Sequence, residues 1–145
     1  MAFLSDATDL VPGDTNGVRD VFVRDRGTGR TERVSVGPGG RQADDESFDL
    51  SISAGGSYVA FWSVATNLVP GDTNGWSDMF VRDLRAGTTR RVCVGPGERQ
   101  ADEGCEERPS VSAGGRVAFV SFATNLVPGD SNGAADVFVR GRPAP

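Results

Sequence analysis

The segment from Leu10 to Gly17 reads Leu-Val-Pro-Gly-Asp-Thr-Asn-Gly, and the chain contains it three times. It returns unchanged from Leu68 to Gly75, and it returns from Leu126 to Gly133 with a single Thr-to-Ser change. The copies start 58 residues apart, so the 145-residue chain holds about 2.5 copies of one unit. Repetition at such a period is typical of solenoids, propellers and arrays, in which one unit cannot bury its apolar face alone.

The complete second copy predicts four short strands and no helix. Residues 49–53, 58–63, 78–83 and 90–94 form apolar or alternating segments, and glycine-containing turns separate them. No segment of helical length has apolar residues at a period of 3.6. Four short strands per unit indicate an antiparallel meander, which is the blade of a β-propeller.

We therefore predict an all-β fold built from propeller blades, each a four-stranded antiparallel meander. Residues 1–145 form a single propeller-fragment domain in this prediction, with repeats at 3–60 and 61–118 and a partial repeat at 119–145. Propellers close with about four to eight blades, so about 2.5 repeats cannot form a ring alone. We expect the ring to close by oligomerisation, and a dimer is the favoured homo-oligomer.

The third copy differs in length from the second at two places. One residue is inserted between Gln100 and Ser112, relative to Gln42 and Ser53, and one residue is deleted before Phe119. Because turns tolerate length changes better than strands do, we expect both changes to lie at turns.

Composition and charge exclude several function classes. All 15 basic residues are arginines, and they are scattered among 20 acidic residues without forming a basic stripe, so nucleic acid is a poor candidate partner. The apolar stretches are shorter than the roughly 18 residues that a membrane span needs. The first residues lack the charged and apolar regions of a signal peptide, so the sequence predicts none and assigns no compartment.

Four segments between residues 53 and 92 resemble a known family. They are Ser-Ala-Gly-Gly at 53–56, Tyr-Val-Ala-Phe at 58–61, Asp-Met-Phe-Val-Arg-Asp at 78–83 and Thr-Thr-Arg-Arg-Val at 88–92. Together they resemble the TolB-type, WD40-like β-propeller repeat. The form with Asn-Leu-Val-Pro-Gly-Asp-Thr-Asn-Gly looks like a subgroup that is common in high-GC bacteria and often found in exported proteins.

The resemblance covers residues 2 to about 140 and implies a β-propeller. It departs from the family at Gly55 and Gly114, which stand where the family usually has Asp. Propellers serve in binding, in scaffolding and in catalysis, so the resemblance implies a fold more specifically than a function.

The repeated loops contain a candidate calcium site. Alternate oxygen-bearing side chains, a glycine and a later carboxylate resemble part of an EF-hand loop, and calcium is therefore the candidate cofactor. Pro12 stands where the first ligand of such a loop would be, which leaves fewer oxygens than the 6–8 that calcium prefers. The alternative is a hairpin turn with Asn-Gly at positions of positive φ. The candidate metal ligands are Asp14, Asn16, Asp20, Asp72, Asn74, Asp78, Asp130, Asn132 and Asp136.

The two cysteines form a candidate disulfide. Cys93 and Cys105 stand where the first copy has Ser35 and Ser47. A paired replacement suggests that the two positions face each other, as a disulfide requires, although two independent replacements would give the same sequence. A disulfide would indicate an oxidising compartment.

The sequence gives little support for an enzyme and identifies no catalytic residue, although its abundant Asp and Glu leave carboxylate-pair glycosidase chemistry open. The chain has no histidine, which removes the commonest general base and every Ser–His or Cys–His pair. We predict a non-enzymatic scaffold or binding module of near-identical repeats that self-assembles into a closed ring, with a second copy of itself as partner. The alternatives are a calcium-dependent propeller that binds a carbohydrate-like ligand, and a fragment of a larger exported enzyme.

Overall fold

The computed structural model describes residues 1–141 and has an all-β fold, as the sequence predicts. In these residues no α-helix occurs, and no helix has the length and apolar character of a membrane span. Two 3-10 turns, η1 (Pro38–Gly40) and η2 (Pro96–Glu98), follow the third and seventh strands. The ten strands are β1 (Ala2–Ser5), β2 (Asp20–Arg24), β3 (Thr31–Arg33), β4 (Ser47–Ile52), β5 (Tyr58–Ser63), β6 (Asp78–Asp83), β7 (Thr88–Arg91), β8 (Cys105–Val111), β9 (Val117–Ser121) and β10 (Asp136–Arg140).

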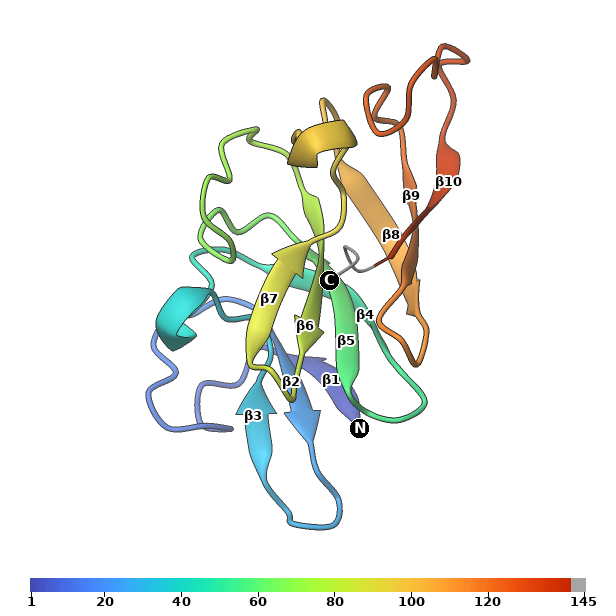
Figure 1. The fold of residues 1–145 in the computed structure, drawn as a ribbon. Coiled ribbons are helices and arrows are strands. Elements are labelled where there is room, and N and C mark those ends of the chain that lie inside the picture. Colours follow the sequence, from blue (N-terminus) through green and yellow to red (C-terminus); the bar gives the residue numbers. More distant parts are fainter. Residues whose placement is uncertain (142–145) are drawn as a thin grey trace.

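The strands form three antiparallel meanders, one for each copy of the repeat. Their orders are β1-β2-β3, β4-β5-β6-β7 and β8-β9-β10. The four-stranded sheet lies between the two three-stranded sheets (Figure 1). Within residues 1–141, the first sheet has no counterpart of β4 and the third sheet has no counterpart of β7.

The three sheets share one register. Phe61 of β5 lies opposite Phe80 of β6, and their rings stack with centroids 5.9 Å apart. The equivalent pairs in the other two sheets, Phe3 with Phe22 and Phe119 with Phe138, each stack at 5.8 Å. The 58-residue period of the sequence is therefore also a period of the structure.

The central sheet is buried on both faces. Successive strand residues point to opposite faces, so Phe80 enters one apolar cluster while Met79 and Val81 enter another. The Phe80 cluster includes Val21 of the first sheet, and the Met79 cluster includes Val117 of the third. Burial on both faces explains why β5 and β6 are nearly continuous apolar segments instead of alternating ones.

A bulge in β8 holds the residue that is inserted in the third copy. In β4 a single residue, Asp49, interrupts the pairing with β5 and has a positive φ of 26°. In β8 the interruption extends from Glu106 to Ser110 and includes Glu107 with φ 68°. The expectation that the insertion lies at a turn is therefore wrong, because a bulge takes up an extra residue inside a strand.

The compensating deletion does lie at a turn. In the β4–β5 turn, the backbone N–H of Ser53 donates to the carbonyl of Tyr58, and in the β8–β9 turn that of Ser112 donates to Arg116. The second turn is one residue shorter. The bulge and the shorter turn together keep β9 in phase with β5.

Candidate functional site

The three repeated loops, which we call the signature loops, connect β1 to β2, β5 to β6 and β9 to β10. In each loop the last glycine has a positive φ: 68° at Gly17, 72° at Gly75 and 64° at Gly133. Other L-residues rarely adopt this conformation, so the Asn-Gly step forms the turn expected of it. The acidic residue three positions later begins the next strand.

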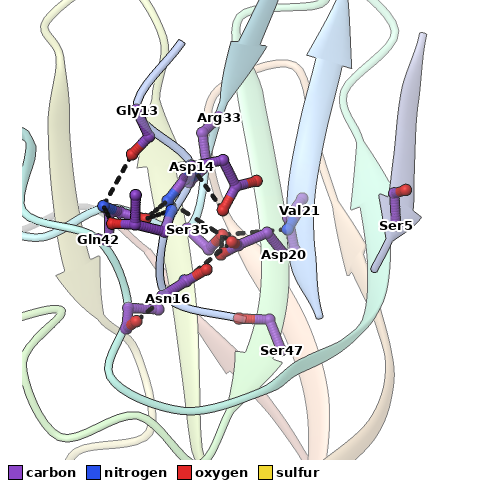
Figure 2. Close-up of polar contacts among 12 residues, drawn as sticks. Ser5, Gly13, Asp14, Asn16, Asp20, Val21, Arg33, Ser35, Gln42 and Ser47 are labelled. Atoms are coloured by element: carbon purple, nitrogen blue, oxygen red, sulfur yellow. Dashed lines mark hydrogen bonds and ion pairs between the residues drawn. The ribbon is translucent and has the colours of Figure 1, made fainter. Parts of the chain in front are cut away.

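The first signature loop surrounds an arginine from the edge strand β3. Arg33 Nη2 lies 3.1 Å from Asp14 Oδ1, and its Nη1 lies 3.6 Å from Asp20 Oδ2. All three side chains are at most 6% exposed. The guanidinium therefore forms ion pairs with two buried carboxylates, as Figure 2 shows.

The second signature loop repeats this arrangement with β7. Arg91 Nη1 lies 3.0 Å from Asp72 Oδ1 and 2.8 Å from Asp78 Oδ2. The Asp side chains are 4% and 1% exposed. Recurrence of the same ion pairs 58 residues apart makes the arginine a fixed part of each complete repeat.

A glutamine forms hydrogen bonds with the backbone of the signature loop in each of these two sites. The backbone N–H of Thr15 donates to Gln42 Oε1 over 3.0 Å, and Gln42 Nε2 donates to the Gly13 carbonyl over 2.9 Å. Gln100 likewise accepts from the N–H of Thr73 at 2.9 Å and from Arg91 Nη1 at 3.0 Å. Backbone of the loop, arginine and glutamine thus form one connected network.

The asparagine of each loop acts as a donor. Asn16 Nδ2 donates to Asp20 Oδ2 over 2.9 Å and to the Ala43 carbonyl over 3.1 Å. Asn74 Nδ2 donates to the Ala101 carbonyl over 3.3 Å. Calcium would need oxygen atoms at this place. In the first two loops, the Asn amide N–H groups and an arginine guanidinium from the edge strand occupy it instead.

Calcium binding stays a prediction, but the described geometry of the first two loops is that of an arginine site. Among residues 1–141, no group of three or more His, Cys, Asp or Glu side chains is placed to hold a metal ion.

The third signature loop has the same Asp and Asn residues, but no described arginine lies among them. Asn132 Nδ2 donates to Asp136 Oδ2 over 2.9 Å, as its equivalent does in the first loop. No arginine of the described part of the chain lies within ion-pair distance of Asp130 or Asp136, and both are only partly buried. They line an open hollow of about 450 Å³ that also includes Pro128 and Phe138.

The two cysteines lie beside the second signature loop and are joined as a disulfide. Cys93 follows β7 and Cys105 begins β8, and their Cα atoms are 6.3 Å apart. Both side chains are fully buried. The disulfide therefore links the central sheet to the third sheet.

The replacement of serine by Cys93 changes the environment of a buried carboxylate. In the first copy, Ser35 Oγ donates to Asp20 Oδ1 over 2.5 Å. In the second copy the equivalent oxygen, Asp78 Oδ1, is buried without a hydrogen-bond partner. Burial raises the pKa of Asp78 to about 6, against the lowering effect of Arg91. Burial also raises the pKa of Asp20, but there the Ser35 hydroxyl is the strongest opposing influence.

The sequence patterns did not identify the two arginines and the two glutamines of these networks. A signal was present, because Arg33 and Arg91 recur 58 residues apart, and so do Gln42 and Gln100. Buried carboxylate pairs need a compensating cation, and an edge-strand arginine at the repeat period was the available one.

Comparison with known protein families finds none that matches this chain. A comparison with curated proteins finds no match either.

Proposed function

We propose that the chain is a non-enzymatic scaffold or binding module of the TolB-like β-propeller type, whose repeats self-assemble through their outer sheet faces. The observation that supports this proposal most directly is an apolar face on β10. Val137 and Val139 are 75% and 67% exposed. Their equivalents in the central sheet, Met79 and Val81, are 0% and 2% exposed because the third sheet covers them.

The opposite end of the chain offers a complementary surface. In the central sheet, Phe61 and Phe80 form the face that packs on the first sheet. The equivalent pair in the first sheet is Phe3 with Phe22; Phe22 is fully buried within the chain, and Phe3 is partly exposed on that face. A second copy could therefore place its β1–β3 sheet on the β8–β10 sheet in the way that neighbouring sheets pack within one chain.

Such a contact joins two different surfaces and is therefore head-to-tail. Head-to-tail contacts close into rings when the rotation between copies permits, and otherwise they continue as filaments. Two chains supply six sheets, which falls within the range of about four to eight blades in closed propellers. A two-chain ring would cover both open faces at once.

The arginine sites support a non-enzymatic role. Acid–base chemistry by paired carboxylates needs groups that can exchange protons with a substrate. In the first two signature loops the carboxylates are almost fully buried and paired with Arg33 and Arg91. We assign these networks a structural role in holding the edge strand on each sheet.

The mass of the purified chain in solution tests self-assembly. Multi-angle light scattering at micromolar concentration should give a discrete species near twice the chain mass of 15.2 kDa. A Val137→Asp/Val139→Asp variant should be a folded monomer, because charge on the exposed face opposes its burial. Val127→Asp is the matched control, since Val127 is 46% exposed on the third signature loop and not on a strand. A wild-type monomer at these concentrations would refute the proposal.

A further inference from the structure

We propose that the third signature loop and the free edge of β10 bind an extended peptide segment that carries an arginine. The arginine would lie between Asp130 and Asp136, and its strand would add to β10 as the fourth strand of the third sheet. This site lies on a strand edge and is separate from the sheet face that we propose for self-assembly.

The two complete repeats provide the template for this interaction. β3 pairs with β2 so that Arg33 lies opposite Phe22, and β7 pairs with β6 so that Arg91 lies opposite Phe80. In both sheets the strand that delivers the arginine is the edge strand, and its pairing is short. The same side chains therefore recognise an arginine strand twice within one chain.

The third repeat presents the same acceptors to an incoming strand. The N–H of Val34, which follows Arg33, donates to the Val21 carbonyl over 2.7 Å. The N–H of Val92, which follows Arg91, donates to the Met79 carbonyl over 2.8 Å. The equivalent carbonyl belongs to Val137 of β10, which pairs only with β9 among the described strands. Unpaired strand edges accept added strands through backbone hydrogen bonds.

The loop already has one hydrogen bond of the occupied first loop. The bond from Asn132 to Asp136 has the same length, 2.9 Å, as that from Asn16 to Asp20. Asp136 is therefore held in place before binding, which lowers the cost of ordering it. Two carboxylates at the site select a cation, and a guanidinium can donate to both.

A glutamine on the same segment would add a second contact. In the complete repeats, Gln42 and Gln100 stand nine residues after the arginine and bond to the backbone of the loop. The equivalent loop groups in the third repeat are the Gly129 carbonyl and the Ser131 N–H. The preferred ligand therefore has arginine followed by an apolar residue, a Gly-Pro-Gly turn and a glutamine.

A synthetic peptide with the sequence of residues 28–43 carries all these elements and no cysteine. Labelled at its N-terminus, it should bind the full chain saturably in a fluorescence anisotropy titration. The Arg33→Ala peptide should bind at least about tenfold more weakly, since a hydrogen bond to a charged group is worth at least that factor. The Arg30→Ala peptide is the matched control, because Arg30 is 75% exposed in the protein and should be dispensable.

The protein side of the contact is tested with Asp130→Asn/Asp136→Asn, which should weaken binding of the unchanged peptide to a similar degree. The peptide variants leave the protein unaltered, so they remain informative if this protein variant misfolds. Absence of saturable binding at millimolar peptide, or equal binding of the Arg33→Ala and unchanged peptides, would overturn the proposal. Light scattering of the unliganded chain reports on self-assembly independently.

Discussion

A serine restored at position 93 should change how the stability of the protein depends on pH. Asp78 Oδ1 lacks the hydroxyl donor that Asp20 Oδ1 receives from Ser35. Burial raises the pKa of Asp78 to about 6 in the folded protein, from an ordinary value of 3.8. Between these values, the folded state holds a proton that the unfolded state has released. The free energy of unfolding therefore falls as pH rises from about 4 to about 6, by up to about 1.4 kcal/mol per pH unit.

Two double variants isolate the hydroxyl, because both lack the disulfide. In Cys93→Ser/Cys105→Ser, the new hydroxyl should donate to Asp78 Oδ1 and stabilise the charged carboxylate. In Cys93→Ala/Cys105→Ser no donor is present, so the pKa of Asp78 should stay raised. A hydrogen bond to a charged group is worth about 1.5–3 kcal/mol. We expect the stability advantage of the serine variant to be larger at pH 7 than at pH 4, by about 1–2 kcal/mol.

Urea unfolding followed by far-UV circular dichroism, at pH 4, 5, 6 and 7, measures this difference directly. The other carboxylates contribute equally to both variants: burial raises the pKa of Asp72, while hydrogen bonds lower the pKa of Asp25 and Asp102. If the two variants lose the same stability between pH 4 and pH 7, the missing hydroxyl is not what distinguishes Asp78 from Asp20.

Three further predictions concern the core and the signature loops. Phe80→Ala should cost roughly 3–5 kcal/mol of unfolding free energy, whereas Phe122→Ala, at a side chain 59% exposed, should cost little; equal losses in chemical unfolding would contradict the sheet packing described above. Arg91→Met should cost about 3–5 kcal/mol at pH 7, because it leaves two buried carboxylates without a cation, and clearly less at pH 4; a loss independent of pH would mean that the arginine contributes packing alone. Calcium should not raise the melting temperature through the two loops whose carboxylates pair with arginine. The Asp130→Asn/Asp136→Asn variant should therefore have the same melting temperature in millimolar calcium and in chelator. A higher melting temperature in calcium would show that the ion displaces a guanidinium.

The pattern of apolar residues predicted the bounds of a strand well where the buried residues are also the residues that pair with neighbouring strands. β5 and β6 have the predicted bounds, 58–63 and 78–83, because both lie in the middle of the central sheet. The fourth strand was predicted at 90–94 and lies at Thr88–Arg91. Val92 and Val94 are buried, but Val94 forms an isolated bridge with Gln100 beyond the strand. Their apolar character therefore predicted that both are buried, but not that regular strand pairing ends at Arg91.

The candidate site was only half predictable, because its cation comes from another strand. The spacing of Asp14, Asn16 and Asp20 identified a cluster of oxygen-bearing side chains, and a calcium loop uses the same residue types. The distinguishing residue, Arg33, lies 19 positions after Asp14 and reaches it only because β3 pairs with β2. The local sequence identifies the carboxylates that accept the ion pairs. The arginine that donates to them is brought to the loop by pairing between strands.

The three signature loops show how nearly identical motifs acquire different roles. Asp72 and Asp78 form ion pairs with Arg91 and are almost fully buried, so in that repeat the loop holds the edge strand β7 on its own sheet. The third loop keeps the hydrogen bond from Asn132 to Asp136, but Asp130 and Asp136 are partly exposed, beside an edge of β10 that pairs with no other strand of residues 1–141. Our proposal is that the chemistry that holds Arg33 and Arg91 serves recognition in the third repeat. In this proposal, the role of a signature loop depends on whether its sheet already has the edge strand that carries the arginine.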